Sequence, residues 1–275
     1  MSAELFFIFT LALKMAVTAG FVVCASIITE RAGPVIGALV STLPISAGPA
    51  YVFLSLDHDA AFIASGALAS IGINAATGVF AIVYVILAQR HGILVSLGAA
   101  LGIWTVLAVI ITQWEFSLLT ALAANVIVYL VAIPLGYRYR DVKMPLILRR
   151  WFDVPLRAAM VATLIATVVI IGARVGPVLT GVVATVPIVL TSLILILQPR
   201  IGGPATAAVI AYTMWGLIGF GSAVVALHLT VERIGSPAAL VLALAVAVGW
   251  NLAIWASRRR RLLAQKKTTP RRLRP

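Results

Sequence analysis

Residues 31–45 read RAGPVIGALVSTLPI, and residues 174–188 read RVGPVLTGVVATVPI. The two stretches are identical at eight of fifteen positions and lie 143 residues apart without a gap. Each begins with Arg and a Gly-Pro turn and carries a second proline ten residues later, Pro44 in the first copy and Pro187 in the second. Self-similarity at a fixed offset indicates an internal repeat.

The composition is that of a membrane protein. Of the 275 residues, 62% are hydrophobic and 11% are charged, and the mean hydropathy is +1.11, whereas a soluble domain is about 45–50% apolar and about 25% charged. Lipid offers no partner for backbone N–H and C=O groups, so apolar segments of about 20 residues are predicted to be α-helices. The sequence predicts nine of them, an all-α polytopic fold: 4–29, 35–56, 60–88, 93–112, 117–137, 156–173, 178–198, 204–230 and 237–257.

The offset of 143 residues aligns the first four segments with the last four. Gly78 meets Gly221, and Arg90 meets Arg233. The fifth segment has no counterpart and joins the two copies. The predicted organisation is a four-helix repeat (1–112), a linking helix with a basic loop (113–155), a second four-helix repeat (156–257) and a basic tail (258–275).

This arrangement predicts that the two repeats are inverted. Four crossings return the chain to its starting side, and the fifth delivers it to the other side before the second copy begins. With the N-terminus outside, the basic loop and tail fall inside together with Arg31, Arg90 and Arg200, and only Arg174 and Arg233 fall outside. The positive-inside rule therefore favours nine crossings with the C-terminus in the cytoplasm. Inverted repeats are typical of transporters.

The basic residues point to lipid rather than nucleic acid. The net charge is +13, but its carriers lie between and after the apolar segments, so the expected partners are anionic headgroups at the basic loop and tail, with no nucleic acid. A homodimer is left open. Cys24 is the single cysteine, which excludes an intrachain disulfide. The first residues, MSAELFF, lack the basic region of a cleaved signal peptide.

At the repeat motif the chain resembles the GlpM-like family of small bacterial inner-membrane proteins, each about one repeat long. The matching parts are a first helix that opens near a basic residue, a Gly-Pro turn, and a second helix with Gly six residues before Pro. Gly181 precedes Pro187 in this way, whereas Ala38 replaces the glycine before Pro44. The resemblance implies a four-helix unit and a bacterial inner (plasma) membrane location rather than an activity. Pairs of such small proteins resemble drug/metabolite transporters in architecture.

The two repeated prolines mark the candidate substrate site. A proline inside a helix removes one backbone hydrogen bond and frees a carbonyl, which can bind a substrate if it lines a cavity. The alternative is a packing kink, since prolines are frequent in spanning helices. Hydroxyl groups lie beside both prolines: Ser41, Thr42 and Ser46 near Pro44, and Thr185, Thr191 and Ser192 near Pro187.

Two further polar residues lie deep in apolar segments. Asn74 is near the middle of the third segment and needs a polar partner, either a substrate or another helix. Tyr212 shares a helix face with Trp215 and forms either a stacking wall for substrate or part of the core. Asn125 and Tyr129 are four residues apart on the linking helix and are interpreted as structural.

Lys14 and Arg157 are the charge candidates, at equivalent positions of the two copies. A cation within a spanning segment is a functional hypothesis for an anionic substrate. The alternative is that Lys14 extends its ammonium group to the outer interface.

The sequence shows no signature of an enzyme. There is no P-loop, no HExxH motif and no cluster of His and Cys, so no catalytic residue, metal or cofactor is predicted. No carboxylate lies in mid-segment, which favours a uniporter, an exchanger or sodium coupling over proton coupling. The leading interpretation is a secondary transporter of a small molecule with alternating access about Pro44 and Pro187. The alternatives are a non-catalytic membrane scaffold or assembly factor, and a flippase in which Lys14 and Arg157 hold a lipid phosphate.

Overall fold

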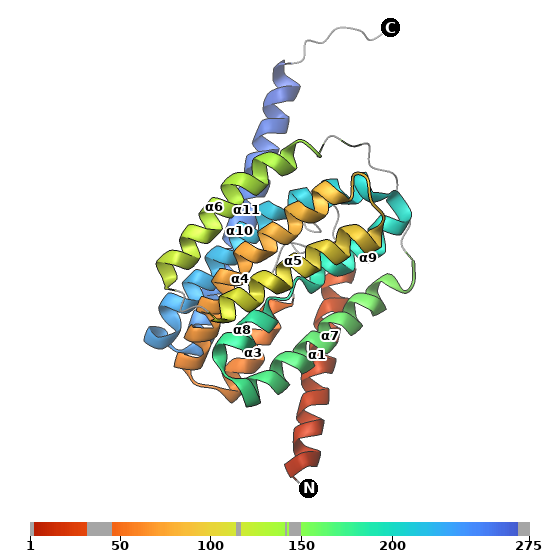
Figure 1. Ribbon diagram of the computed structural model, residues 1–275. Helices are drawn as coiled ribbons and strands as arrows, with labels where there is room; N and C mark the ends of the chain where they lie inside the picture. The colour runs from red at the N-terminus through yellow and green to blue at the C-terminus, as the bar shows by residue number, and fades with distance from the viewer. Residues whose placement is uncertain (1–2, 32–45, 114–116, 141, 143–149, 269–275) are drawn as a thin grey trace.

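A computed structural model describes residues 3–31, 46–113, 117–140, 142 and 150–268. Within these residues all secondary structure is α-helical, without a strand. The helices, labelled as in Figure 1, are α1 (Ala3–Arg31), α3 (Ala47–Asp57), α4 (Ala60–Leu87), α5 (Ile93–Gln113), α6 (Leu118–Tyr137), α7 (Asp153–Val175), α8 (Pro177–Ala184), α9 (Ile188–Ile201), α10 (Gly203–Ile234) and α11 (Ser236–Thr268).

The protein is an all-α, multi-pass membrane protein, as predicted. In the described part of the chain eight helical segments are long and apolar enough to span a bilayer, α8 and α9 together counting as one. The remaining predicted segment, 35–56, is represented by α3, and its first half lies outside the described residues. The helix α11 extends to Thr268, well past the apolar segment predicted to end at 257.

The two repeats pack as an inverted pair about the centre of α4 and α10. Asn74 Nδ2 donates to the carbonyl of Leu217 at 3.1 Å, and these residues are 143 positions apart. His228 Nδ1, near the end of α10, lies 2.9 Å from the carbonyl of Ala64, near the start of α4. Equivalent helices of the two copies therefore cross antiparallel, which is the geometry of a local twofold axis.

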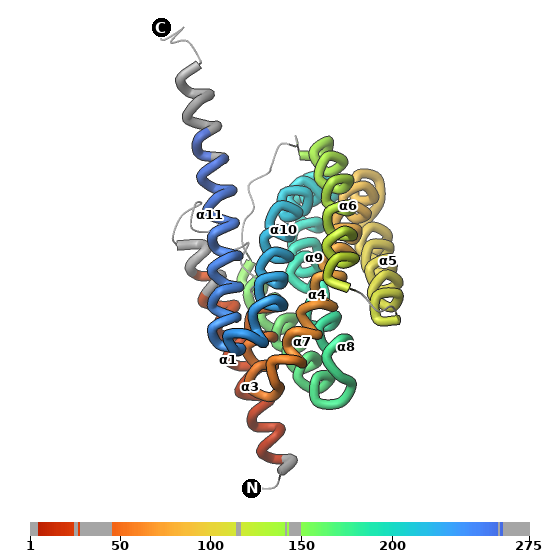
Figure 2. The backbone as a smooth tube through the Cα atoms, turned by 90° about the vertical axis from the view of Figure 1, so that its left-hand side faces the viewer, coloured from red at the N-terminus to blue at the C-terminus, as the bar shows by residue number. Residues whose placement is uncertain are grey.

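The other helices follow the same symmetry. The helices α1 and α7 pack together, and Val22 late in α1 contacts residues early in α7. The helix α5 packs on α4, and α11 packs on α10 on the other side of the molecule (Figure 2). The linking helix α6 contacts both α4 and α10 and has no counterpart. The start of α1 and the end of α11 lie at opposite ends of the bundle (Figures 1 and 2), as an odd number of crossings requires.

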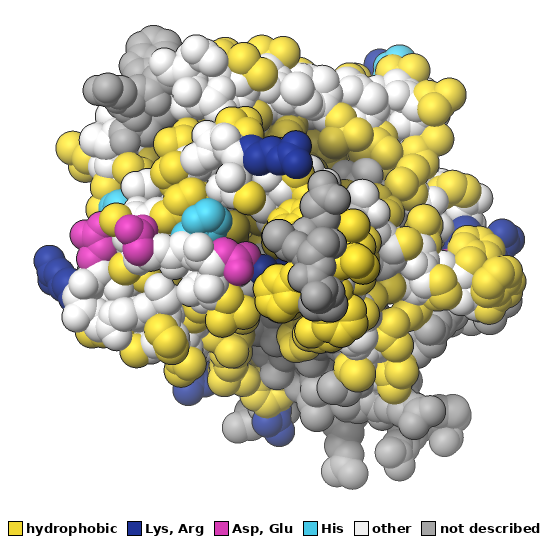
Figure 3. Space-filling model, turned by 90° about the horizontal axis from the view of Figure 1, so that it is seen from below, with side chains coloured by type: hydrophobic (Ala, Val, Ile, Leu, Met, Phe, Trp, Pro, Cys, Tyr) yellow, Lys and Arg dark blue, Asp and Glu magenta, His cyan; other side chains and the backbone are white. Residues whose placement is uncertain are grey.

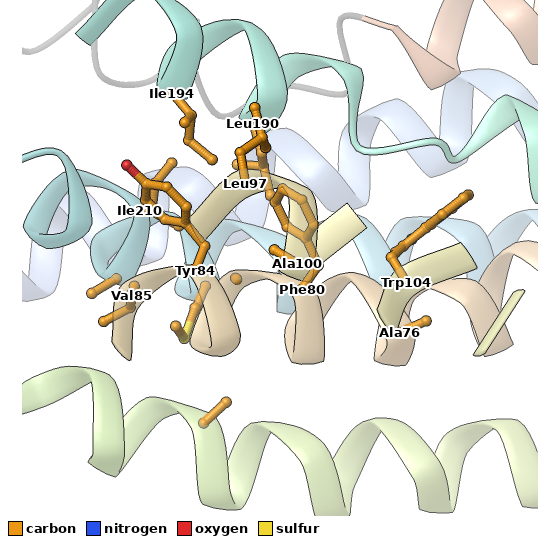
Figure 4. Packing of buried hydrophobic residues seen from close by; sticks show 14 of the residues in the cluster. Ala76, Phe80, Tyr84, Val85, Leu97, Ala100, Trp104, Leu190, Ile194 and Ile210 are labelled. Atoms are coloured by element: carbon orange, nitrogen blue, oxygen red, sulfur yellow. The ribbon is translucent and has the colours of Figure 1, made fainter. Parts of the chain in front are cut away.

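The core around α4 contains bulky aromatic side chains. Phe80 and Tyr84 are fully buried, and in Figure 4 they extend from α4 towards Leu190 and Ile194 of α9, beside Leu97 of α5. This packing fixes the second half of the broken α8–α9 segment against α4.

Acidic and histidine side chains gather on one part of the end at which α1 begins (Figure 3). Among the side chains that the structure describes, the acidic residues at this end are Asp57 at the end of α3, Asp59 before α4 and Glu232 near the end of α10. Asp59 also caps α4, because its side chain accepts from Phe62 N at 2.9 Å.

Candidate functional site

The seventh predicted segment is a broken helix. The helix α8 ends at Ala184, and α9 begins at Ile188 with Pro187 as its N-cap. Thr185 N bonds the carbonyl of Val182 at 3.2 Å, a tightened last turn. Pro187 has no N–H to continue the ladder, so the interruption predicted at this proline is confirmed. Two helix ends therefore face each other inside a spanning segment.

Hydroxyl groups from three helices gather around the end of α8. Thr185 Oγ1 and Ser70 Oγ each donate to the carbonyl of Gly181 at 2.8 Å. Tyr51 Oη lies 2.6 Å from Ser70 Oγ. Thr185 was among the predicted site residues, whereas Tyr51 was missed because nothing in its own segment distinguishes it from a packing residue. The group connects α3, α4 and α8 at the helix break.

Glycines allow α8 to approach α4 this closely. A Cβ atom on Gly181 would lie 2.1 Å from the backbone oxygen of Gly66. Any side chain at position 181 would therefore separate the two backbones and lengthen the bond from Ser70. This close approach explains the glycine in the second repeat motif.

The other predicted hydroxyls do not join this group through a hydrogen bond among the described residues. Ser192 is 3% exposed and donates to Val189 within its own helix. Thr191 is half-buried in the first turn of α9, where its backbone N–H donates to the carbonyl of Pro187 at 2.9 Å. Ser46 is half-buried and precedes α3. Ser41, Thr42 and Pro44 lie outside the described residues.

Asn74 is at the centre of a second polar cluster, which we call the amide cluster (Asn74, Asn125 and Tyr129). Asn74 Nδ2 donates to Asn125 Oδ1 at 2.8 Å, and Tyr129 Oη donates to the carbonyl of Asn74 at 2.9 Å. Asn125 Nδ2 donates to the carbonyls of Ile71 and Ala121 at 2.7 and 2.8 Å. The linking helix therefore attaches to the twofold centre through the Asn125 and Tyr129 pair.

The amide cluster borders a crevice of about 590 Å³ between α4, α6 and α10. Gly221 also lines it, and a Cβ there would lie 2.7 Å from Asn74 Nδ2. The crevice is separate from the helix break, since Thr185 and Pro187 do not line it.

Tyr212 of α10 packs against a basic side chain just after the end of α6. Its ring lies 4.6 Å from the guanidinium carbon of Arg140, which has Tyr137 at 4.8 Å. Arg140 Nη2 also donates to the carbonyl of Ala211 at 3.0 Å. These contacts connect the end of α6 to α10, the role of an interfacial anchor.

Two ion pairs occupy related positions of the two repeats. Lys14 on α1 pairs with Asp57 at the end of α3. In the second repeat Asp153 on α7 pairs with Arg200 at the end of α9, with Nη1 to Oδ2 at 2.7 Å. Asp57 and Arg200 are equivalent by the 143-residue offset.

The polarity of these pairs is reversed between the copies. Arg157 is the exact counterpart of Lys14, but Arg200 pairs with Asp153, one turn earlier. The sequence offered two roles for Lys14, binding an anionic substrate or reaching the outer interface. In the structure Lys14 pairs instead with a carboxylate of its own repeat, that of Asp57. Each pair connects the first helix of a repeat to the end of the second, at opposite ends of the bundle.

Comparisons with protein-family models, curated proteins and solved structures find no match to this chain. The resemblance to the GlpM-like family therefore stays a prediction.

Proposed function

We propose that this membrane protein is a secondary transporter of a small molecule, with alternating access about the helix breaks at Pro187 and Pro44. The observation that supports it is the antiparallel crossing of α4 and α10 at Asn74 and Leu217, equivalent positions of an inverted repeat. Two equivalent halves related in this way can exchange inward-open and outward-open arrangements.

The break between α8 and α9 supplies the binding groups of this proposal. Helix ends leave backbone groups without an intrahelical partner, and within a spanning segment such backbone is tolerated where protein buries it or a cavity borders it. Thr185 is 7% exposed at this point and already engages the carbonyl of Gly181. Movement of α8 against α4 would exchange these bonds for bonds to a polar substrate.

Alternating access predicts that Thr185 is reached from both sides of the membrane. In a Cys24→Ser background, Thr185→Cys is expected to react with an impermeant thiol reagent in intact cells and also in inverted vesicles. The measurement is the labelled fraction at each side. Ile103→Cys is the control, because Ile103 is 40% exposed on the surface of α5 and faces lipid in either state.

The same experiment distinguishes the transporter from a membrane scaffold. A static scaffold would leave Thr185→Cys unlabelled from both sides, because the position is buried. Labelling from one side alone would indicate a fixed vestibule and would contradict alternating access.

We further propose that the protein lies in a bacterial inner membrane with its N-terminus outside, as the distribution of Lys and Arg favours. Single cysteines at Ser117, Lys143 and Thr269 test this orientation. We expect an impermeant reagent to label the cysteine at position 117 in intact cells and the other two only after the cells are opened. Labelling of positions 117 and 143 from the same side would mean that α6 does not cross.

A further inference from the structure

The crevice between α4, α6 and α10 faces the side of the bundle. Val126 and Leu130 of α6 line it and are 58% and 70% exposed. In a spanning helix such exposure means contact with lipid chains. The crevice therefore opens laterally into the bilayer, and an occupant reaches it from the membrane. Its other apolar lining residues include Leu122 of α6 and Ile218 and Val225 of α10.

The amide cluster at the inner wall has all of its hydrogen-bond donors engaged. The two N–H groups of Asn74 go to Asn125 Oδ1 and Leu217 O, and those of Asn125 go to Ile71 O and Ala121 O. The hydroxyl of Tyr129 goes to Asn74 O. An amide side chain has two N–H donors and a phenol has one, so nothing remains for the cluster to donate.

Acceptor capacity remains in the same cluster. Asn74 is 2% exposed, and its Oδ1 has no hydrogen-bond partner in the described part of the chain. Asn125 Oδ1 accepts one bond and has a second lone pair. Asn125 and Asn74 both line the crevice, and Asn125 is the more exposed of the two, so we take Asn125 Oδ1 as the acceptor for an occupant. A donor carried by the occupant would use the second lone pair of Asn125 Oδ1.

We infer that this crevice binds an uncharged lipophilic molecule carrying one hydrogen-bond donor, such as a long-chain alcohol, which enters from the bilayer. No acid, lysine, arginine or histidine occurs among the described lining residues. A charged group would be unpaired there at a high desolvation cost. A volume of about 590 Å³ is within the range of small-molecule sites. The donor meets Asn125 Oδ1, and the chain lies along α6 and α10.

The test uses the full-length protein in lipid nanodiscs with two photoactivatable probes. One is a 16-carbon alcohol with a diazirine on its chain, and the other is its methyl ether, which has the same chain but no donor. After irradiation, labelled peptides are quantified by mass spectrometry. One hydrogen bond is worth about 0.5–1.5 kcal/mol, so the alcohol is expected to label the peptides of α4, α6 and α10 about two- to twelvefold more than the ether.

A pair of adjacent tryptophan substitutions locates the labelling. Val126→Trp fills the crevice and is expected to abolish crevice labelling. Ile127→Trp is the matched control: Ile127 is 63% exposed on the same turn of α6 but does not line the crevice. Asn125→Leu removes the acceptor and is expected to make alcohol and ether label equally.

Equal labelling by alcohol and ether in the unmodified protein would overturn the inference, because no donor would then be recognised. Labelling that survives Val126→Trp would also overturn it, because the probe would then lie elsewhere. The inference does not rest on transport. If Thr185→Cys proved unreachable, the transporter proposal would fail while the crevice result stood.

Discussion

Gly181→Ala is expected to lower the thermal stability of the purified protein sharply. The added Cβ would lie 2.1 Å from the oxygen of Gly66 and 2.7 Å from its carbonyl carbon. These are backbone atoms in the first half of α4, so no side-chain rotation relieves the contact, and the two helices must separate. Overpacking of this kind costs about 1–3 kcal/mol or more. The separation also weakens the bond from Ser70 Oγ to Gly181 O.

Gly98→Ala is the matched control for this substitution. Gly98 is in the interior of α5, and a Cβ there meets nothing within 4 Å. Alanine is about 0.5–1 kcal/mol better than glycine inside a helix, so Gly98→Ala is expected to be neutral or slightly stabilising. The melting temperature of each variant is measured by heating samples and quantifying the protein that remains folded by size-exclusion chromatography. Equal melting temperatures for the two variants would show that α8 does not contact α4 at Gly66.

Most of the helices could be predicted from the sequence because lipid imposes a single solution on an apolar segment. The segment predicted at 93–112 is α5, Ile93–Gln113, and the linking helix predicted at 117–137 is α6, Leu118–Tyr137. The interruption at Pro187 was also predictable, because the missing N–H acts within the chain itself. These features depend on neighbours in sequence and on the solvent.

The contacts of the candidate site could not be predicted in the same way. The repeat offset relates Asn74 to Leu217, but it does not reveal that these two residues lie on the symmetry axis. Tyr51 belongs to the site because α3 packs so that its hydroxyl meets Ser70 of α4, a contact that the sequence does not reveal. Lys14 and Asp57 likewise lie on different segments. The hydrophobic pattern of a segment does not show which other segments are its neighbours, so this pair could not be predicted.

Asp57→Asn and Asp153→Asn each break one of the two ion pairs. The two substitutions are expected to shift the accessibility of a cysteine at position 185 (Thr185→Cys) in opposite directions. Each pair holds the first helix of a repeat against the end of its second, at opposite ends of the bundle. Under alternating access, and with the N-terminus outside as proposed, Asp57→Asn loosens the outer end, so labelling from outside should rise and labelling from inside should fall. Asp153→Asn should do the reverse. A coupling of about 1 kcal/mol raises the labelled fraction of the minor state about fivefold while that population is small, and it lowers the labelled fraction of the major state by a smaller factor.

If the ion pairs act as gates at the two ends, Asp57→Asn and Asp153→Asn must change the labelling of Thr185→Cys in opposite directions. This opposition distinguishes gating from general destabilisation. A merely weakened fold would raise labelling from both sides in both variants, and that result would contradict the gate interpretation. Glu232→Gln is the matched control, because it removes one exposed carboxylate near the same end as Asp57, on α10 rather than on α3.

Exchange of the charges, Lys14→Asp with Asp57→Lys, should restore the original labelling, because it keeps the attraction between α1 and α3 while reversing its polarity. The second repeat already carries that polarity, with the carboxylate on its first helix and the cation at the end of its second.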